Sequence, residues 1–231
     1  MKNFFTSLIL CLLAPFFIYS GEPPVELGTA SSFAVLAGTT VTNTGLTVVT
    51  GDLGVSPGSV VTGFPPGIVI GTIHAADASA AQAQFDLTTA YNDAAGRTSP
   101  TLLITSDIGG VTFAPGVYNA SGSIGITGTV TLDAQGDPNA VFIFQIGSKL
   151  ITTSSSTVSL INGASPSNVF WQVGSSATLG TNSAFNGFIL ALTSITVTTG
   201  VTVNGALLAR NGAVTLDVGC LTTQKPQLDS G

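Results

Sequence analysis

The stretch from Ala184 to Leu216 reads AFNGFILALTSITVTTGVTVNGALLARNGAVTL and contains one short pattern written twice. The pattern starts at Asn186-Gly187 and starts again, eighteen residues later, at Asn204-Gly205. After each copy comes a small pair, then an apolar residue, a threonine and another apolar residue, as in Ile195-Thr196-Val197. A period of about 18 to 20 residues, rich in alternating β-formers, is typical of a stacked β-solenoid coil. We therefore expect a mainly β chain built from such coils.

Weaker copies of the pattern run through most of the chain. They begin at Phe142 and Val169 upstream of the repeat, and at Phe33 and Gly51 near the N-terminus. Aligning the copies by their inward-facing residues predicts one internal column of stacked side chains: Val41, Val60, Val130, Leu150, Ala177, Ile195 and Val214. Because side chains alternate along a strand, the neighbours of each of these residues are expected to face outward.

One segment, Ala75 to Ala95, has the composition of an amphipathic helix. Its predicted apolar stripe recurs at three- and four-residue spacing and consists of Ala78, Ala81, Phe85, Thr88 and Tyr91 or Asn92. Asp77 is placed to cap the first turn, and Gly96 to close the last turn in the left-handed conformation. Five turns span roughly 30 Å, as do about six coils, so the helix is expected to lie along the solenoid and cover one face.

The first twenty residues, Met1 to Ser20, have the features of a secretory signal peptide: one lysine, an apolar core and small residues at the expected cut. The apolar run is short for a membrane span, although an uncleaved anchor is the alternative interpretation. We expect a secreted, extracellular protein with no membrane association after cleavage and a single domain over residues 21–231. Cys11 leaves with the signal peptide, so Cys220 has no partner for an internal disulfide.

The composition argues against several classes of function. Charged residues make up 7% of the chain and the net charge is -6, without a basic patch that would neutralise the phosphates of a nucleic acid. The single histidine, His74, has no cysteine or carboxylate at metal-ligand spacing. We therefore expect no nucleic acid, no metal and no cofactor.

A catalytic site is not expected either. Solenoid lyases and hydrolases need clustered carboxylates together with a lysine or arginine, and the aspartates here mostly stand beside glycine or proline, where turns are expected: Asp52, Asp107, Asp133, Asp137 and Asp217. After loss of the signal peptide four basic residues remain, Arg97, Lys149, Arg210 and Lys225. A paired-carboxylate lyase stays open as the weakest alternative.

The outward neighbours of the predicted column are small and mostly hydroxylated. They are Thr39, Thr40, Thr42, Ser59, Gly128, Thr129, Thr131, Ser175, Ser176, Thr178, Thr193, Ser194, Thr196, Gly212, Ala213 and Thr215. Stacked, they predict a flat face with side chains about 7 Å apart along each strand and about 4.8 Å apart between coils.

The simplest explanation of such a face is a solvated β surface, because threonine is a good β-former. Soluble solenoids usually carry lysine and glutamate as well, because such charged residues keep sheets from associating. Lysine and glutamate are nearly absent from this chain. Threonine rotamers are rigid and hold methyl and hydroxyl groups at fixed spacing, which is a template for an ice-like layer of water. The face therefore favours ice as its target.

Five further motifs, in order, carry a family resemblance. They are Leu27–Gly38 (LGTASSFAVLAG), Thr50–Gly58 (TGDLGVSPG), Phe113–Tyr118 (FAPGVY), Phe142–Ile146 (FIFQI) and Asn204–Ala209 (NGALLA). Together they resemble the secreted microbial ice-binding protein family of cold-adapted bacteria, fungi and diatoms. The resemblance covers the chain from about Leu27 to Leu221.

This resemblance implies an irregular right-handed β-helix of triangular section with one long α-helix packed along one face. It implies that the coil order in space departs from the sequence, because the helix carries the chain to the other end. It also implies that a flat, helix-free face adsorbs to ice and inhibits ice growth or recrystallisation. Lys149 and Ile151 depart from the family's small-residue pattern on that face. We expect a monomeric ice-binding (antifreeze) protein.

The main alternative is a β-solenoid adhesin or carbohydrate-binding module. Aromatic rings exposed on the flat face would favour it, because sugars stack on rings. Trp171 and Phe144 lie on apolar strands, and we expect both in the core.

Overall fold

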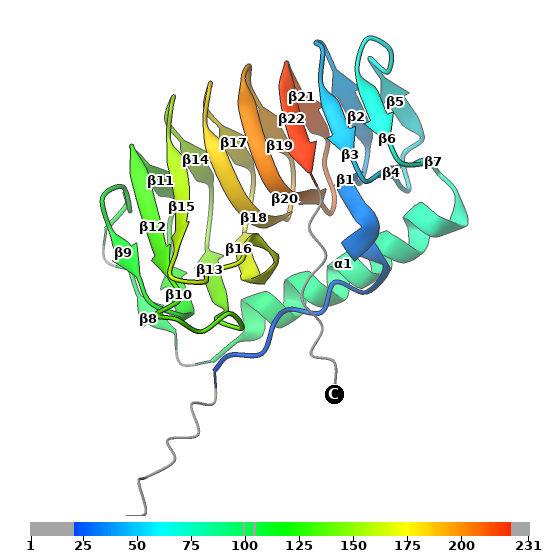
Figure 1. The fold of residues 1–231 in the computed structure, drawn as a ribbon. Coiled ribbons are helices and arrows are strands. Elements are labelled where there is room, and N and C mark those ends of the chain that lie inside the picture. The colour runs from blue at the N-terminus through cyan, green and yellow to red at the C-terminus, as the bar shows by residue number, and fades with distance from the viewer. Residues whose placement is uncertain (1–20, 99, 104, 223–231) are drawn as a thin grey trace, which may run out of the picture.

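The computed structural model describes residues 21–98, 100–103 and 105–222, so the predicted signal peptide, residues 1–20, lies outside the described residues. The chain winds into a stack of coils made of short parallel strands, with one long helix running alongside (Figure 1). The predicted β-solenoid with a single covering helix is confirmed.

Each coil contributes strands to three faces. The helix face contains β1 (Phe33–Ala37), β4 (Asp52–Val55), β7 (Ile73–Ala75), β8 (Thr101–Leu102), β10 (Gly116–Ala120), β13 (Phe142–Ile146), β16 (Val169–Val173) and the second halves of β18 (Ala184–Ala191) and β20 (Val201–Ala209). The threonine face is the outer surface of a seven-stranded sheet formed by β2 (Thr40–Asn43), β5 (Val60–Thr62), β11 (Ile124–Ile126), β14 (Leu150–Thr152), β17 (Ala177–Leu179), β19 (Ile195–Val197) and β21 (Val214–Leu216). The third face contains the first halves of β18 and β20 with β3 (Val48–Thr50), β6 (Ile68–Ile70), β9 (Thr112–Phe113), β12 (Thr129–Asp133), β15 (Thr157–Ile161) and β22 (Gly219–Thr222).

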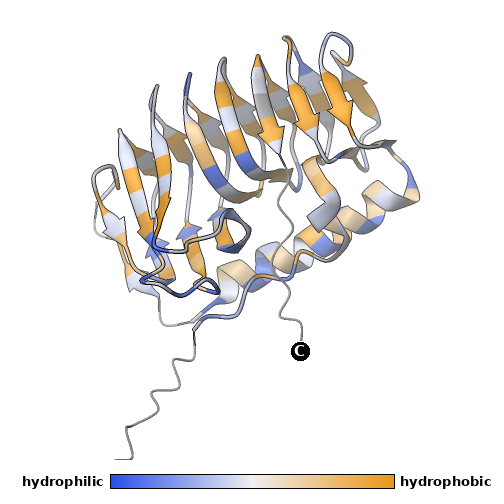
Figure 2. Ribbon diagram, in the orientation of Figure 1, coloured by the Kyte–Doolittle hydropathy of each residue, from blue (hydrophilic) through white to orange (hydrophobic). Residues whose placement is uncertain are grey.

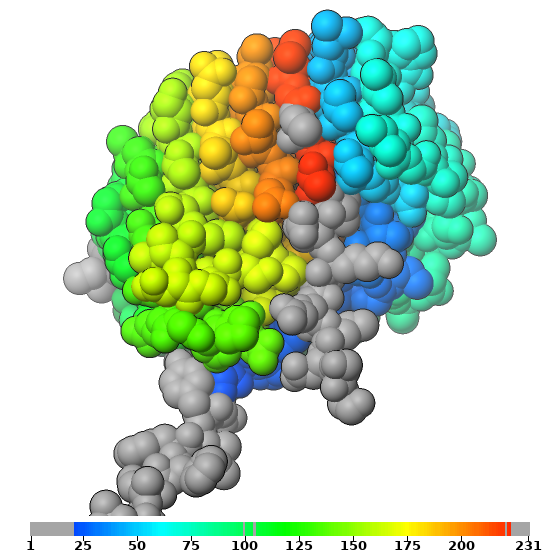
Figure 3. All heavy atoms as spheres, viewed as in Figure 1, coloured from blue at the N-terminus to red at the C-terminus, as the bar shows by residue number. Residues whose placement is uncertain are grey.

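The order of coils in space departs from the order in sequence. The seven-stranded sheet runs β11-β14-β17-β19-β21-β2-β5. From β1 the chain winds outward to one end of the solenoid, α1 carries it to the other end, and the later coils return until β20 pairs with β1. In Figure 3 the last coil, in red, accordingly lies between the orange coil and the blue and cyan N-terminal coils. This confirms the order that the family resemblance implies.

The helix α1 (Ala78–Gly96) begins at the predicted cap, where the Asp77 carboxylate accepts a hydrogen bond of 2.8 Å from the amide of Ala80. Its 19 residues span about 28 Å, close to the roughly 29 Å of six strand spacings. The prediction that Gly96 adopts the left-handed conformation is wrong, because Gly96 is the last residue of the helix. The last carbonyls are instead satisfied from the sheet: Gln145 Nε2 donates to the oxygens of Ala94 and Arg97, at 2.9 Å each.

The predicted apolar stripe of the helix is also wrong in its orientation. Ala78, Ala81 and Phe85 are exposed, Phe85 by 69%, and of the predicted set Tyr91 is buried. The buried side consists of Ala80, Ala83, Leu87, Ala90, Tyr91 and Ala94. Alanine occurs all round this helix, so periodicity could not select a side. The side that packs combines four alanines with Leu87 and Tyr91, which join the apolar side chains of the sheet in one cluster.

The core fills the inside of the coils. On the strands of the threonine face buried and more exposed residues alternate, and Figure 2 shows bands of apolar and polar residues along several strands of the solenoid. The predicted internal column is correct for Val41, Leu150, Ala177, Ile195 and Val214, which pair in register.

Two members of the predicted column are wrong. Val61 is the residue that pairs with Val41, and Val60 faces outward with 49% exposure. Val130 is buried, but in β12 beneath the third face, and Ile124 takes its place in the column. The error has a physical source: apolar-threonine-apolar segments occur on both faces, as Val130-Thr131-Leu132 in β12 of the third face and as Ile195-Thr196-Val197 in β19 of the threonine face.

The repeated Asn-Gly pair marks a corner of the solenoid. Gly187 and Gly205 have φ angles of 109° and 152°, where β18 and β20 bend from the third face into the helix face. A Cβ on Gly187 would collide with Val169, and one on Gly205 would collide with the backbone of Gly187. Glycine is required here both for its conformation and for the close approach of adjacent coils.

Candidate functional site

The threonine face presents two columns of outward side chains, one on each side of the buried column. From the β5 end, the first column is Val60, Thr40, Ala213, Ser194, Ser176, Lys149 and Ser123, and the second is Thr62, Thr42, Thr215, Thr196, Thr178, Ile151 and Gly125. Neighbouring strands lie about 4.8 Å apart, and alternate residues on one strand lie nearly 7 Å apart. Five consecutive strands therefore present a threonine at the same height.

The five threonines of the second column keep their hydroxyls uncommitted. Within the described part of the chain, no side-chain hydrogen bond involves Thr42, Thr62, Thr178, Thr196 or Thr215. Thr62 and Thr215 are exposed, and the other three are half-buried by their neighbours. Each threonine can therefore offer both a hydroxyl and a methyl group to whatever lies against the sheet.

The hydroxyls next to the corner are used differently. Those of Ser176 and Thr193 share a hydrogen bond of 2.6 Å, and Ser194 Oγ accepts from the amide of Ala213 at 3.2 Å. These bonds link one coil to the next and add to the backbone pairing of the strands. Serine hydroxyls of the first column therefore take part in bonds between coils, whereas the threonine hydroxyls of the second column do not.

The sixteen predicted site residues divide into three groups. Eight belong to the two outward columns: Thr40, Thr42, Ser176, Thr178, Ser194, Thr196, Ala213 and Thr215. Five stand one residue before the first column, at the corner where the sheet begins: Thr39, Ser59, Ser175, Thr193 and Gly212. The other three, Gly128, Thr129 and Thr131, belong to the third face, so their predicted stacking with the rest is wrong.

The sequence reasoning missed four small or β-branched members of the two columns. They are Val60, Thr62, Ser123 and Gly125. Thr62 was not predicted as a site residue because either Val60 or Val61 could be the inward residue of this strand. A shift of one residue exchanges the inward and outward sides. Gly125 was not predicted because the next strand, Thr129-Val130-Thr131, matches the threonine-apolar-threonine pattern better than the strand of Gly125 does.

Charge is nearly absent from this surface. Within its two columns Lys149 is the one charged residue. Asp217 lies at the corner towards the third face, where the Thr199 hydroxyl at 2.5 Å and the Val218 amide at 2.9 Å hold the pKa of its carboxyl below the usual value. A hydrogen bond from Thr127, and another from the Gly109 amide, likewise lower the pKa of Asp107. Both carboxylates stabilise turns.

The remaining candidate carboxylates do not converge. Asp52, Asp133 and Asp137 each accept a backbone amide, from Thr72, Gln135 and Asn139 respectively. The Arg210 guanidinium lies 4.7 Å from the ring centre of Tyr91 on the helix face. No group of three or more metal-ligating side chains exists within the described residues.

Aromatic rings are missing from the two outward columns. As predicted, Trp171 and Phe144 are buried, with 0% and 1% exposure, and their rings stack 4.1 Å apart inside the solenoid. The feature that would favour sugar binding at this face is therefore not found there.

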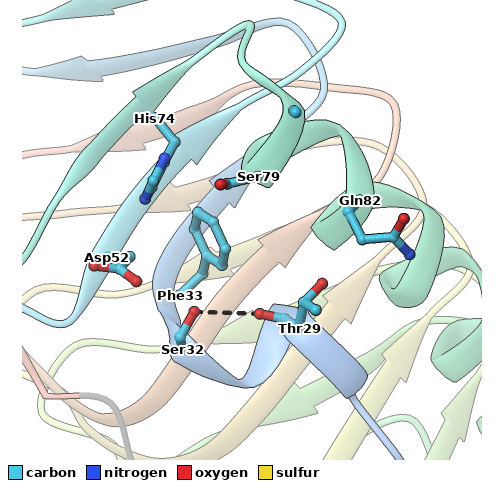
Figure 4. A pocket seen from close by; sticks show the side chains of 8 residues that line it. Thr29, Ser32, Phe33, Asp52, His74, Ser79 and Gln82 are labelled. Atoms are coloured by element: carbon cyan, nitrogen blue, oxygen red, sulfur yellow. Dashed lines mark hydrogen bonds between the residues drawn. The ribbon is translucent and has the colours of Figure 1, made fainter.

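A separate pocket of about 410 Å³ lies beside the start of α1, against η1 (Gly28–Ser32), β4 and β7. Figure 4 shows Asp52, His74, Ser79 and Gln82 around the ring of Phe33. His74 Nδ1 lies 2.6 Å from Asp77, and the Ala80 amide and then His74 lower the pKa of that aspartate. These contacts secure the first turn of the helix.

No helix in the described parts of the chain combines the length and apolarity needed to cross a bilayer.

Comparison with known proteins points to one family. The model of the family described as "Ice-binding-like" matches residues 35–222. An ice-binding protein of Nostoc sp. (strain HG1) is 59% identical over 192 residues, which cover 83% of this chain and 71% of that relative. A crystal structure of an ice-binding protein from an Antarctic biological consortium has 51% identity and a TM-score of 0.86, covering 88% of this chain and 92% of that one. Another, from the Antarctic ascomycete Antarctomyces psychrotrophicus, has 44% identity and a TM-score of 0.84, covering 87% and 98%.

Proposed function

The chain belongs to the ice-binding-like family, so binding to ice is its function, and we propose that the threonine face is the surface that makes the contact. The observation that carries this proposal is the column of five threonines with uncommitted hydroxyls on consecutive strands. The helix face is covered by α1, and on the third face the pairing of β15 with β18 narrows to one residue pair, Thr157 with Ala184. The threonine face is not covered by α1, and its seven strands pair without a register shift.

The mechanism follows from spacing rather than from any single strong bond. Threonine is β-branched and therefore restricted in χ1, so stacked methyl and hydroxyl groups repeat at the strand spacing of about 4.8 Å. Water held between the methyl groups and bonded to the hydroxyls becomes part of the crystal surface. Each contact contributes little, but all are made at once, so detachment requires breaking them together. Bound molecules then pin the ice front, which curves between them and stops growing.

Two matched variants test the location of the site. Thr196 on β19 and Thr129 on β12 both face outward from a strand, on the threonine face and the third face respectively. We expect Thr196→Tyr to lose most of its ice shaping and thermal hysteresis, because the ring holds the sheet away from the crystal. Thr129→Tyr should keep wild-type activity. Circular dichroism should show the same melting temperature for both.

The opposite result is informative. Loss of activity in Thr129→Tyr alone would place ice on the third face. If the wild-type chain lets crystals grow as smooth discs at millimolar concentration, ice binding itself fails, and a glycan-array screen would then test the carbohydrate-binding alternative.

We also propose that the chain acts outside the cell as a non-catalytic monomer formed by residues 21–231. The signal-like sequence of residues 1–20 supports secretion, and the lack of converging carboxylates among the described residues supports a binding role. Mass spectrometry of protein secreted by an expressing host should give a mature N-terminus close to Gly21. Light scattering should give a mass near that of one chain.

A further inference from the structure

The threonine face is not uniform along the solenoid. Counting from the β5 end, the first five strands present small or β-branched short side chains in both columns. The sixth strand, β14, changes both columns at once, to Lys149 and Ile151. Ile151 is 43% exposed and Lys149 is exposed as well. Behind them, β11 returns to small residues with Ser123 and Gly125.

We propose that Lys149 and Ile151 set the extent of the ice-contact area, limiting it to the five strands from β5 to β17. This inference rests on the threonine face being the ice-binding surface. Five strands span about 19 Å between the outermost threonines, out of about 29 Å for the whole sheet. The contact area therefore lies off-centre, towards the edge of the sheet formed by β5.

Both side chains are unsuited to an ice contact, for different reasons. Isoleucine has a carbon chain where threonine has its hydroxyl, so it extends further from the sheet and offers no hydrogen bond to water. Lysine carries a strongly hydrated ammonium group on a flexible stem, and its water shell does not match a regular lattice. Because the two stand side by side on one strand, they form a ridge across the face. The ridge separates β11 from the threonine array even though β11 itself is flat.

Lys149 has a simpler possible role, which is to keep neighbouring molecules from associating through the sheet. That role would not involve Ile151, and it would leave ice activity unchanged when the pair is replaced. The two explanations therefore differ in what the replacement does.

The first experiment moves the boundary outward. In K149S/I151T the small-residue array would extend from five strands to seven, which increases the number of contacting strands roughly 1.4-fold. We expect thermal hysteresis at equal molar concentration to rise by at least about that factor. The matched control is Ile161→Thr, the same replacement at a 39% exposed position on β15 of the third face, which should leave activity unchanged.

The second experiment moves the boundary inward. In S176K/T178I the β14 pair is copied onto β17, whose residues stand beside it in register, so the array shrinks to four strands. Activity should fall to about four fifths of the wild-type value or lower, in proportion to the number of contacting strands. Melting curves should show that both double variants stay folded.

If both double variants retain wild-type activity while Thr196→Tyr is inactive, ice binds the threonine face but β14 is not its boundary, and this inference is overturned. If Thr196→Tyr is itself fully active, the location proposed for the site fails first.

Discussion

The helix face and the threonine face are built from the same coils, and yet one is interior and the other is surface. Leu190 on β18 and Thr196 on β19 are six residues apart and both point away from the solenoid axis. Leu190 is fully buried under α1, whereas Thr196 is left open. The backbone is alike at the two positions, so the outward side chain alone decides whether a face needs a cover.

The cover itself is matched to the sheet beneath it. On the helix face one column runs Leu36, Leu208, Leu190, Gln172 and Gln145 in register. The leucines pack beneath the helix with Leu87, and the two glutamines bind its C-terminal half. Gln172 donates to the Tyr91 hydroxyl at 2.8 Å, and Gln145 donates to the helix-end carbonyls. The two columns of the threonine face contain no glutamine that could bind a covering helix in this way.

The largest effect should come from giving the helix face a residue of the threonine face. Leu190→Thr removes apolar contact from a fully buried site and leaves a hydroxyl there without a partner, so the free energy of unfolding should fall by about 3 kcal/mol. Denaturant unfolding followed by circular dichroism measures this. A loss below about 1 kcal/mol would show that α1 does not depend on this packing.

A somewhat smaller effect is expected from the polar anchor. Gln145 is 5% exposed, and its side chain reaches three carbonyl groups at the end of α1. Gln145→Leu leaves those carbonyls without a donor and should lower the free energy of unfolding by about 1 to 3 kcal/mol. Asn92→Leu on the exposed side of the same helix is the control and should change stability by about 0.5 kcal/mol at most. Equal stability of the two variants would contradict the role of Gln145.

Lowering the pH should reduce the stability of the fold without changing the ice activity of the folded protein. Burial raises the pKa of Asp86, but hydrogen bonds from Thr29 and Gln82 outweigh it and bring the pKa below its usual value. A lowered carboxyl pKa stabilises the fold at neutral pH, and this contribution is lost as the pH falls below about 4. The threonine columns carry no carboxylate, so ice activity should stay constant until the chain unfolds.

Melting temperature and thermal hysteresis, measured side by side from pH 7 to pH 3, test this difference. Asp86→Asn should flatten the stability curve without changing the activity of the folded protein. Activity that declines above pH 5 while the melting temperature is constant would contradict it.

These contrasts also explain what the sequence could and could not reveal. The coil pattern, the helix and its Asp77 cap were predictable because each is a local signal: a repeat, a composition and a capping residue. The side of the helix that packs was not, because alanine surrounds it and the deciding partners, such as Gln145, are distant in sequence. For the site, the alternation along each strand correctly predicted that Thr178, Thr196 and Thr215 face outward. It could not predict that Thr129 belongs to the third face, because strands of different faces share the same alternating pattern.

The smallest change in stability should come from placing a leucine of the helix face on the threonine face. This substitution tests whether ice recognises the hydroxyls of the column. Thr196→Leu puts the side chain of Leu190 on the open face, where it displaces water rather than packed atoms, so the free energy of unfolding should change by about 0.5 kcal/mol at most. Thermal hysteresis should nevertheless fall to about three fifths of the wild-type value or lower, because the leucine breaks the column at its fourth position, leaves three consecutive threonine strands and removes one hydroxyl. Thr202→Leu, at an exposed site on the third face, is the matched control and should stay fully active. If Thr196→Leu stays active too, apolar contact alone suffices for ice, and the regular hydroxyls of the column are not what the crystal recognises.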